Sequence, residues 1–522
     1  MITPDSGFGP FPPLRINRIP WGEPHDHDRL GRMGAAGRRG DGGAGPVRSG
    51  QVTPRELATQ AALAVSRLNP KLQGIIEVFA DTLDNPSIDA PNGQGLLHGV
   101  PMFMKDLGSG LSGRHQDSGS ALTRGTMVRA TDPTIANFLR AGLVPLGRSA
   151  TPEFGMTFDT VTQYDGAEPV ITRNPWNLTR TPGGSSGGSA ACVAAGVVPL
   201  SMSSDGGGST RIPAAFCGLV GLKASRGRVP QPLGRNEYVT RVSIDGVVTR
   251  SVRDTAAVFE YLTRIPNGGS FIRLGPPQSS YLRAIERDPT RLRIGLSTGE
   301  WGRDAPVNLQ VTSRVREVAR LMESLGHHVE ELVDTEICDW AVMWETYIQH
   351  WIGSRAGIAL MARDKGIGRQ QLQTLLTPMT WRHFIASERY DKYDMLRMMS
   401  GNNTVTRQFG ALMDRYDVLL TPTLAIRVPP ANGAYSLLRD EDLDDWVGRL
   451  ADSCRYTMPA NETGMPAISV PAGLDTDGLP IGVQFHGNFA REDVLLSLAA
   501  QVERARPEWF GAVPPVHVTR AE

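Results

Sequence analysis

Short apolar segments alternate with helical patterns in the first part of the chain. Residues 53–56 have the sequence of a helix N-terminal capping box, and apolar residues at helical spacing follow up to Pro70, where we expect the helix to end. Further apolar runs predict strands at residues 75–78, 99–104 and 143–146, with a helix at 132–141. Strands that alternate with helices in this way are typical of an α/β sheet covered on both faces.

The pattern changes between about residues 270 and 450, where longer amphipathic helical patterns such as 312–325 occur. We expect this stretch to be a helical, variable region that shapes a pocket. Beyond it, apolar runs at 416–420 and 480–485 again predict buried strands. Residues 51–522 are therefore predicted to form a single domain whose core is completed by its C-terminal part.

Residues 1–50 are rich in proline, glycine and arginine and carry little apolar surface, which predicts a disordered tail. Its arginines would also suit a nucleic-acid-binding arm. A solvated extension, or an upstream stretch translated because Met33 is the true start, explains them more simply.

The overall charge excludes some classes of partner. Lys and Arg together number 54, as do Asp and Glu, so no net field steers the protein to nucleic acid or to an anionic membrane. A small neutral substrate fits this balance better. No apolar run reaches the roughly 18 residues of a membrane span, and the N-terminus lacks a secretory pattern.

The cysteines indicate the compartment. The chain has 4 cysteines, namely Cys192, Cys217, Cys338 and Cys454. They are too few for a disulfide scaffold and lack the spacing of metal ligands. We therefore expect a protein of the reducing cytoplasm with no metal site. The sequence leaves open whether the chain acts alone or as a homodimer.

Two segments are dense in glycine and serine. Residues 183–191 continue into a run of small apolar residues that predicts a tightly packed helix, and residues 204–214 carry three glycines directly before Ser209. Glycine lets the backbone adopt conformations closed to larger residues, so N–H groups and hydroxyls can converge on developing negative charge. A flexible linker is the alternative, but a linker is not normally continued by a buried helix.

With other motifs in the same order, these segments resemble the amidase signature enzymes. The matching motifs lie between about residues 60 and 500, at 99–106, 183–191, 204–213, 217–223, 227–230, 463–467 and 478–484. The resemblance implies the amidase signature fold, an α/β architecture with one large mixed twisted sheet covered by helices on both faces. It also implies an amidase that needs neither metal nor organic cofactor.

The resemblance assigns roles residue by residue. Ser209 is the expected nucleophile and Lys105 is the expected base. Ser185, which follows a cis peptide bond, is the expected proton relay. The oxyanion is expected to bind the backbone N–H groups of Gly206, Gly207 and Gly208, together with that of Ser209. Three further residues are expected to support the site, namely Ser186, Asp205 and Arg211.

Elementary chemistry agrees with the role of Lys105. A lysine is protonated at neutral pH and becomes a base only if burial lowers its pKa, and Lys105 ends the apolar strand predicted at 99–104. For Arg211, a structural ion pair is favoured over substrate contact, because ion pairs also explain charged residues near sites. Lys223 is interpreted as structural on the same ground.

Within the family, the likeness extends to hydrolases of nylon-type 6-aminohexanoate cyclic dimers and of other aryl or alkyl amides, some of which also open carbamates. The stretches that carry it are 102–107, 174–178 and 491–496. These are framework motifs, so the expected substrate stays a small-molecule amide or carbamate, with urethane and ester cleavage reachable by the same nucleophile.

Other functions compete with this hypothesis. Residues 183–187 also satisfy the Gly-x-Ser-x-Gly elbow, which would make Ser185 the nucleophile of an α/β-hydrolase-type esterase with a histidine partner at His327, His328 or His486. An amidase-like subunit of a glutamine-dependent tRNA amidotransferase is a further alternative, although residues 147–150 depart from the Gly-Lys-Thr-Asn usual there. A scaffold without chemistry is disfavoured, because all three expected catalytic residues are present.

Aromatic residues recur at helical spacing in the variable region, at Trp340, Trp344, Tyr347 and Trp351. Such a stripe is more often part of a core than a platform for a substrate, and we interpret it as core.

Overall fold

The computed structural model describes residues 44–520 except 165–166, 236–241, 269–271 and 278. Residues 1–43 of the predicted tail lie outside this part, so their disorder stays a prediction. The last residues of that tail form the short helix α2 (Ala44–Arg48), and the Arg48 guanidinium donates to the carbonyl of Leu96. The described structure therefore begins before residue 51, with a helix that the sequence did not predict.

The first predicted helix runs further than expected. It is α3 (Pro54–Leu72), and the capping box of Thr53 and Glu56 is formed as predicted. The predicted end of this helix at Pro70 was wrong, because a proline near the C-terminus of a helix removes one N–H without stopping the last turn. Gln73, in the left-handed conformation, ends the helix, and its N–H donates to the carbonyl of Asn69 at 2.8 Å.

Three strands near the N-terminus form a small sheet in the order β1-β3-β2. Its strands are β1 (Ile75–Val78), β2 (Pro101–Lys105) and β3 (Val144–Ser149). β3 pairs antiparallel with β1 and parallel with β2. The predicted strands are confirmed, and Lys105 is the last residue of β2.

The main sheet has 8 strands and is mixed, as the resemblance implied. In spatial order they are β10 (His328–Glu331), β9 (Arg293–Leu296), β11 (Val418–Pro422), β13 (Pro480–Gly487), β12 (Ala467–Leu474), β7 (Val220–Lys223), β8 (Ile244–Thr249) and β6 (Leu200–Asp205). β9 pairs parallel with β10 and β11, and the other pairs are antiparallel. Strands on both sides of the variable region thus share one sheet.

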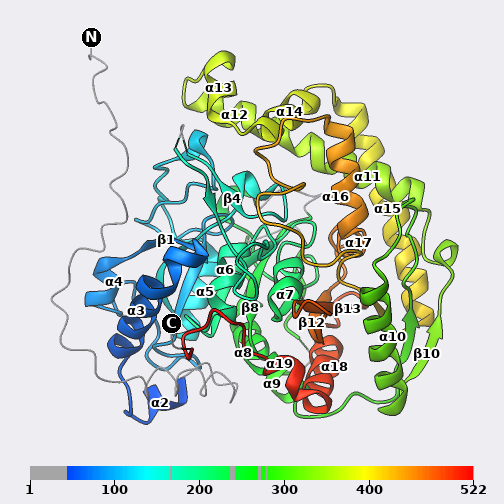
Figure 1. Ribbon diagram of the computed structural model, residues 1–522, viewed down its shortest axis with the longest axis horizontal. Coiled ribbons are helices and arrows are strands. Elements are labelled where there is room, and N and C mark those ends of the chain that lie inside the picture. The colour runs from blue at the N-terminus through cyan, green and yellow to red at the C-terminus, as the bar shows by residue number, and fades with distance from the viewer. Residues whose placement is uncertain (1–43, 165–166, 236–241, 269–271, 278, 521–522) are drawn as a thin grey trace.

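Helices cover both faces of this sheet (Figure 1). Successive residues of β11 point to opposite faces, as in any strand, with Leu420 in one apolar cluster and Leu419 in another. The first cluster contains residues of α8 (Val252–Leu262), α10 (Leu309–Ser324) and α18 (Glu492–Ala505), and the second contains residues of α7 (Arg211–Cys217). The predicted fold class is confirmed.

The remaining helices lie around these layers. They are α4 (Ala80–Asp84), α5 (Pro133–Ala141), α6 (Gly187–Ala194), α9 (Tyr281–Ala284), α11 (Trp340–Gly353), α12 (Gly357–Asp364), α13 (Arg369–Leu375), α14 (Pro378–Ser387), α15 (Lys392–Arg415), α16 (Leu443–Cys454), α17 (Met458–Thr463) and α19 (Pro507–Phe510). A separate pair, β4 (Val161–Thr162) and β5 (Val170–Ile171), forms a 2-stranded sheet. The predicted helix at 132–141 and the Ala-rich helix after residue 183 correspond to α5 and α6.

The region from 270 to 450 is helical only in part. It supplies α11 to α15, which lie at the top and right of Figure 1, but also the sheet strands β9, β10 and β11. The sequence predicted β11 but neither β9 nor β10. Neither strand shows an apolar run, since β9 has the sequence Arg-Ile-Gly-Leu and β10, His-Val-Glu-Glu, has no buried position.

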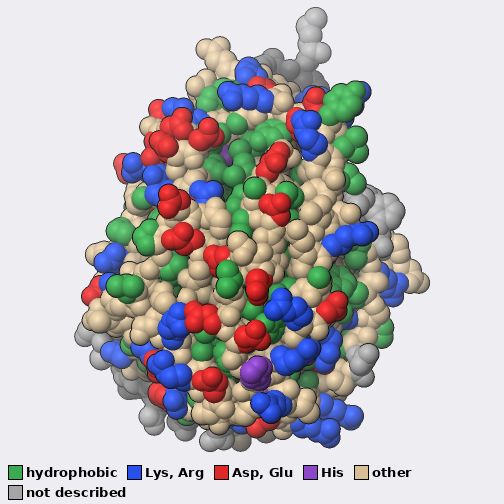
Figure 2. All heavy atoms as spheres, turned by 90° about the vertical axis from the view of Figure 1, so that its right-hand side faces the viewer, with side chains coloured by type: hydrophobic (Ala, Val, Ile, Leu, Met, Phe, Trp, Pro, Cys, Tyr) green, Lys and Arg blue, Asp and Glu red, His purple; other side chains and the backbone are tan. Residues whose placement is uncertain are grey.

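Charged side chains of both signs intermingle on the face that carries α10, β10 and α15 (Figure 2). The described part of this face therefore lacks the broad single-sign field that steers proteins to nucleic acid. Across the described ranges, no helix combines the length and apolar character needed to cross a bilayer. The four cysteines are free and buried.

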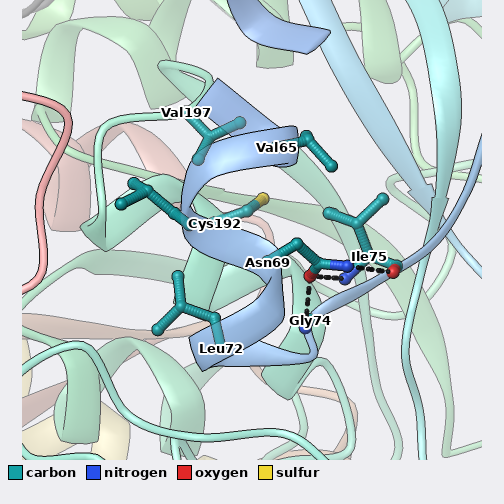
Figure 3. A pocket seen from close by; sticks show the side chains of 8 residues that line it. Val65, Asn69, Leu72, Gly74, Ile75, Cys192 and Val197 are labelled. Atoms are coloured by element: carbon teal, nitrogen blue, oxygen red, sulfur yellow. Dashed lines mark hydrogen bonds between the residues drawn. The ribbon is translucent and has the colours of Figure 1, made fainter. Parts of the chain in front are cut away.

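A small cavity lies between α3, β1 and α6 (Figure 3). Its lining is mostly apolar, and the Asn69 side chain at its edge accepts hydrogen bonds from the N–H groups of Gly74 and Ile75, both at 2.9 Å. The cavity measures about 10 Å³, room for one water at most. It is a gap in the packing and too small for an organic substrate.

Candidate active site

Lys105 ends β2 inside the protein, with 1% of its surface exposed. Its Nζ lies 2.7 Å from Ser185 Oγ and 2.9 Å from Ser204 Oγ. Burial lowers the pKa of Lys105 to about 7, against the opposing charges of Asp245 and Asp205. A large fraction of this amine is therefore neutral near neutral pH, with a lone pair able to accept a proton.

Ser185 lies directly before α6, and the Gly184–Ser185 peptide bond is cis, as the resemblance implied. The side chain is 2% exposed. Gly155 packs against it so closely that a β-carbon there would lie 2.9 Å from Ser185 Oγ. The Ser185 hydroxyl is thus enclosed, with the amine of Lys105 as its close polar neighbour.

Ser209 lies in the loop of residues 206–209, between β6 and α7. Gly206 and Ser209 are partly exposed, whereas Gly207, Gly208 and the residues that flank the loop are buried. The N–H of Ser186 donates to the carbonyl of Ser209 at 3.3 Å. This bond brings the two glycine- and serine-rich segments together, with Lys105 behind the first and Ser209 at the surface of the second.

Asp205 and Arg211 flank this loop and stabilise it. Their side chains form a two-point ion pair, with Nε and Nη2 of Arg211 each 2.9 Å from a carboxylate oxygen. Burial acts to raise the pKa of Asp205, but the Arg211 charge and its hydrogen bonds outweigh it and hold that pKa well below its usual range. Asp205 also accepts from the N–H of Gly208 at 2.8 Å. Arg211 thus forms the structural ion pair favoured from the sequence.

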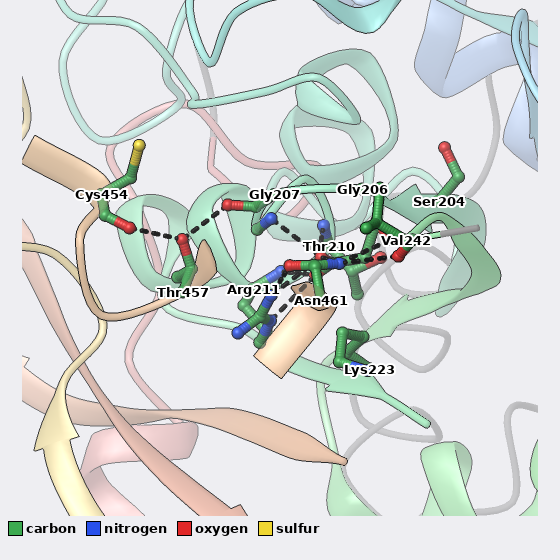
Figure 4. A network of polar contacts seen from close by, with 12 residues as sticks. Ser204, Gly206, Gly207, Thr210, Arg211, Lys223, Val242, Cys454, Thr457 and Asn461 are labelled. Atoms are coloured by element: carbon green, nitrogen blue, oxygen red, sulfur yellow. Dashed lines mark hydrogen bonds and ion pairs between the residues drawn. The ribbon is translucent and has the colours of Figure 1, made fainter. Parts of the chain in front are cut away.

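Side chains from distant parts of the chain hold three successive carbonyls, that of Asp205 and the first two of the loop. Figure 4 shows two of these side chains, Asn461 and Thr457. Asn461 Nδ2 donates to the carbonyl of Asp205 at 2.9 Å, Tyr347 to that of Gly206 at 3.3 Å, and Thr457 to that of Gly207 at 2.6 Å. Among the described residues, no hydrogen bond engages the N–H groups of Gly206, Gly207 or Ser209. These three donors remain available to a ligand.

The other predicted residues have supporting contacts. Ser186 Oγ accepts from the N–H of Ser204 at 3.3 Å, which joins the start of α6 to β6. Lys223 is buried at the end of β7, and its Nζ donates to the carbonyl of Ala224 at 2.8 Å. Within the ranges described, no three His, Cys, Asp or Glu side chains gather as metal ligands would.

The histidines nominated for an esterase triad have other partners. His327 Nε2 lies 2.8 Å from Gln501 Oε1, and His486 Nε2 lies 2.8 Å from Gln484 Nε2. His328 is exposed on β10. None of the hydrogen bonds between described residues joins a histidine to Ser185, which faces a lysine instead.

Four contributors were not predicted from the sequence, namely Ser204, Tyr347, Thr457 and Asn461. Ser204 opens the same glycine- and serine-rich segment as Ser209, which was a usable signal. The stripe that includes Tyr347 was interpreted as core, and Trp340, Trp344 and Tyr347 are indeed buried in one apolar cluster. Its tyrosine hydroxyl, however, reaches the loop.

Comparison with known proteins points to the same family over most of the chain. The Amidase family profile matches residues 58–496. The chain is 34% identical over 489 residues to the 6-aminohexanoate-cyclic-dimer hydrolase of Paenarthrobacter ureafaciens, an alignment that covers 90% of this chain and 94% of the relative.

Solved structures agree. The structure of 6-aminohexanoate cyclic dimer hydrolase complexed with substrate superposes with a TM-score of 0.82 at 28% identity, covering 91% of this chain and 98% of the other. A bacterial aryl acylamidase of the amidase signature enzymes gives a TM-score of 0.76 at 26% identity, covering 89% and 96%. Family profile, relatives and fold together show that this chain belongs to the Amidase family, as an amidase signature hydrolase acting on amides.

Proposed function

We propose that the protein hydrolyses small-molecule amides through a Ser-cisSer-Lys triad in which Ser209 is the nucleophile, Ser185 the relay and Lys105 the base. The observation that carries the proposal is the 2.7 Å contact between a buried, partly neutral Lys105 amine and the enclosed hydroxyl of Ser185. An amine of this kind can accept a proton near neutral pH, which an exposed lysine cannot.

The reaction has two halves. Lys105 takes the proton of Ser185 as Ser185 takes that of Ser209, whose Oγ bonds to the amide carbon. The tetrahedral intermediate collapses with cleavage of the C–N bond, and the leaving nitrogen receives the proton back through Ser185. Water, deprotonated by the same route, then attacks the ester at Ser209. The bond between the acyl carbon and Ser209 Oγ breaks, Ser209 regains its proton through Ser185, and the acid leaves.

The oxyanion of the tetrahedral intermediate needs donors that are not otherwise used. The N–H groups of Gly206, Gly207 and Ser209 meet this requirement, whereas the N–H of Gly208 already donates to Asp205. We therefore assign the first three as donors. Gly208, expected from the sequence to be a donor, instead helps to stabilise the loop.

The substrate class follows from the relatives. Because relatives with full-length matches are named for a cyclic amide dimer and for aryl acylamides, we propose small linear or cyclic amides as substrates. Carbamates and esters present a similar carbonyl to the same nucleophile, so urethane cleavage is a proposed side activity. Four free, buried cysteines fit a reducing cytoplasm as the place of action.

A substrate panel with matched variants tests the proposal. Wild type, Ser209→Ala and the control Ser66→Ala, which removes a hydroxyl on α3, are assayed on an anilide, a cyclic amide dimer and a carbamate. We expect Ser209→Ala to lose every activity together and the control to keep them all. Acetylation by p-nitrophenyl acetate, followed by peptide mass mapping, should place the acetyl group on Ser209. An acetyl group on Ser185 would instead favour an esterase elbow.

The same panel addresses the tRNA amidotransferase alternative. A subunit of that kind works only with a partner that binds tRNA, so the purified chain should be inactive on simple amides. Turnover of an anilide by the chain alone, sensitive to Ser209→Ala, would exclude the alternative.

A further inference from the structure

Peptide groups of the loop at 206–209 are held at their carbonyl oxygens. In a trans peptide the carbonyl and the following N–H point in opposite directions, so a side chain that holds the carbonyl also sets where the N–H points. The only cis bond among the described residues is Gly184–Ser185, so this rule applies throughout the loop. The side chains that hold its carbonyls therefore orient its N–H groups.

Two neighbouring peptides of the loop differ in how they are held. The peptide between Gly207 and Gly208 is fixed at both ends, since Thr457 donates to its carbonyl and its N–H donates to Asp205. The peptide between Gly206 and Gly207 is held at its carbonyl by Tyr347, and its N–H has no partner among the described residues. Its orientation therefore depends on Tyr347.

Tyr347 is well placed to control that peptide. It is 3% exposed, and its ring stacks on Trp351 with the centroids 6.0 Å apart, which restricts its movement. Its hydroxyl fills the space over Gly207, where a β-carbon would lie only 2.2 Å from Tyr347 Oη. The backbone of Gly207 lies outside the left-handed region, so it is this hydroxyl that requires glycine there.

We infer that Tyr347 is a positioning residue of the reaction, which holds the Gly206 carbonyl from α11 and so aims the Gly207 N–H at the oxyanion. The inference rests on the proposed function, because it needs the oxyanion to form beside Ser209. Burial, the largest influence, raises the pKa of Tyr347 well above its usual value. The phenol therefore stays a donor throughout the pH range of an assay.

The first test is Tyr347→Phe, compared with Tyr456→Phe. Both replacements remove a mostly buried phenol that donates to a glycine carbonyl, but Tyr456 bonds Gly299, outside the loop. Loss of one oxyanion donor costs about 10²- to 10³-fold in kcat, and a donor that has only lost its orientation should cost less. We expect kcat for an anilide to fall about 10- to 50-fold in Tyr347→Phe, with KM nearly unchanged. The kcat of Tyr456→Phe should stay within about threefold of the wild-type value.

The second readout isolates the oxyanion. A trifluoromethyl ketone adds to the serine oxygen, forming a C–O bond while the carbonyl electrons move to its oxygen and the serine proton passes to the base. Its inhibition constant should rise in Tyr347→Phe by the same factor by which kcat/KM falls, because both depend on the same N–H. An unchanged inhibition constant beside a reduced kcat/KM would overturn the inference.

A pair of substitutions tests the contact itself. Gly207→Ala should abolish activity in the wild-type background, because its methyl group collides with Tyr347 Oη. In the Tyr347→Phe background the nearest ring atom lies 3.5 Å away, an ordinary contact, so the double variant should recover to about the activity of Tyr347→Phe alone. Additive losses in the double variant would contradict the role given to the hydroxyl.

Failure of the inference can be told apart from failure of the proposed function. Ser209→Ala should no longer form the trifluoromethyl ketone adduct at all. If it still does, the nucleophile is misassigned and the proposed function falls. If it does not, but Tyr347→Phe behaves as Tyr456→Phe does, the proposed function stands and Tyr347 is structural.

Discussion

Two buried lysines lie at the ends of two strands, and they differ in what their amines contact. Lys105 ends β2 and Lys223 ends β7, and burial lowers the pKa of each to about 7. The Nζ of Lys105 lies within 2.9 Å of the hydroxyls of Ser185 and Ser204. The Nζ of Lys223 donates to the backbone carbonyl of Ala224.

The difference teaches that a lowered pKa does not by itself make a base. A hydroxyl can give up one proton while it takes another, so Lys105 contacts a group that is able to relay a proton. A carbonyl oxygen has no proton to give, so Lys223 can hold the end of β7 but has no route to a nucleophile through that contact. The partner of the amine decides its role.

The largest effect should separate the two lysines directly. Lys105→Met removes the proposed base and should lower kcat for an anilide about 10³- to 10⁴-fold, near the upper end of what general base catalysis contributes. Lys223→Met keeps a similar unbranched shape and should lower kcat less than about fivefold. Steady-state assays below the melting temperature of both variants check this, and equal losses would remove the distinction.

Ser185→Ala should have the next largest effect, because it leaves the base intact and removes the route to it. We expect kcat to fall about 10²- to 10³-fold, since a water can carry the proton only poorly in an enclosed space. Ser186→Ala is the matched control, one residue along, and should cost less than about tenfold. The same assay, with both variants at one pH above 8, makes the comparison.

Ser204→Ala should change the pKa of Lys105. The Ser204 hydroxyl accepts from Nζ and stabilises the charged amine more than the neutral one. Its removal should therefore lower the pKa of Lys105 further and move the rise of kcat/KM to lower pH, with kcat down about threefold to tenfold. A shift to higher pH would mean that this hydroxyl favours the neutral form.

The smallest effect concerns stability. Between the folded pKa of about 7 and the ordinary value of 10.5, the unfolded chain binds more protons at each lysine than the folded chain does. The contribution of each lysine to the free energy of unfolding should therefore rise with pH over this range, by of the order of 1 kcal/mol per pH unit. Lys223→Met should remove about half of that slope. Urea unfolding at pH 7, 8 and 9 measures it, and an unchanged slope would mean that Lys223 is not buried as a neutral amine.

The candidate site could be located in the sequence because its signals are local. Ser185 and Ser209 each lie in a short glycine- and serine-rich segment, and Lys105 ends an apolar run, so the segments could be singled out from their residue types. The roles of the three residues came from the resemblance to the amidase signature enzymes. The strand at 75–78 and the helix that ends before Gly142 were predicted for the same reason, because turn residues bound a clear apolar pattern.

The anchors of the loop could not be predicted in this way. Tyr347, Thr457 and Asn461 contact it from 141, 250 and 256 residues away, and no local pattern marks a residue whose role is to hold a distant carbonyl. The strands β9 and β10 were missed for a related reason. β9 pairs with β11, which lies in a distant part of the chain, and β10 joins the sheet through β9.

The most direct test of the central claim is the pH dependence of kcat/KM for an anilide in wild type and in Lys223→Met. Because Lys105 acts only when neutral, both proteins should show activity that rises with pH and levels off, with a midpoint near the pKa of about 7. A profile that is flat in wild type, or whose midpoint disappears with Lys223→Met, would contradict the assignment of Lys105 as the base.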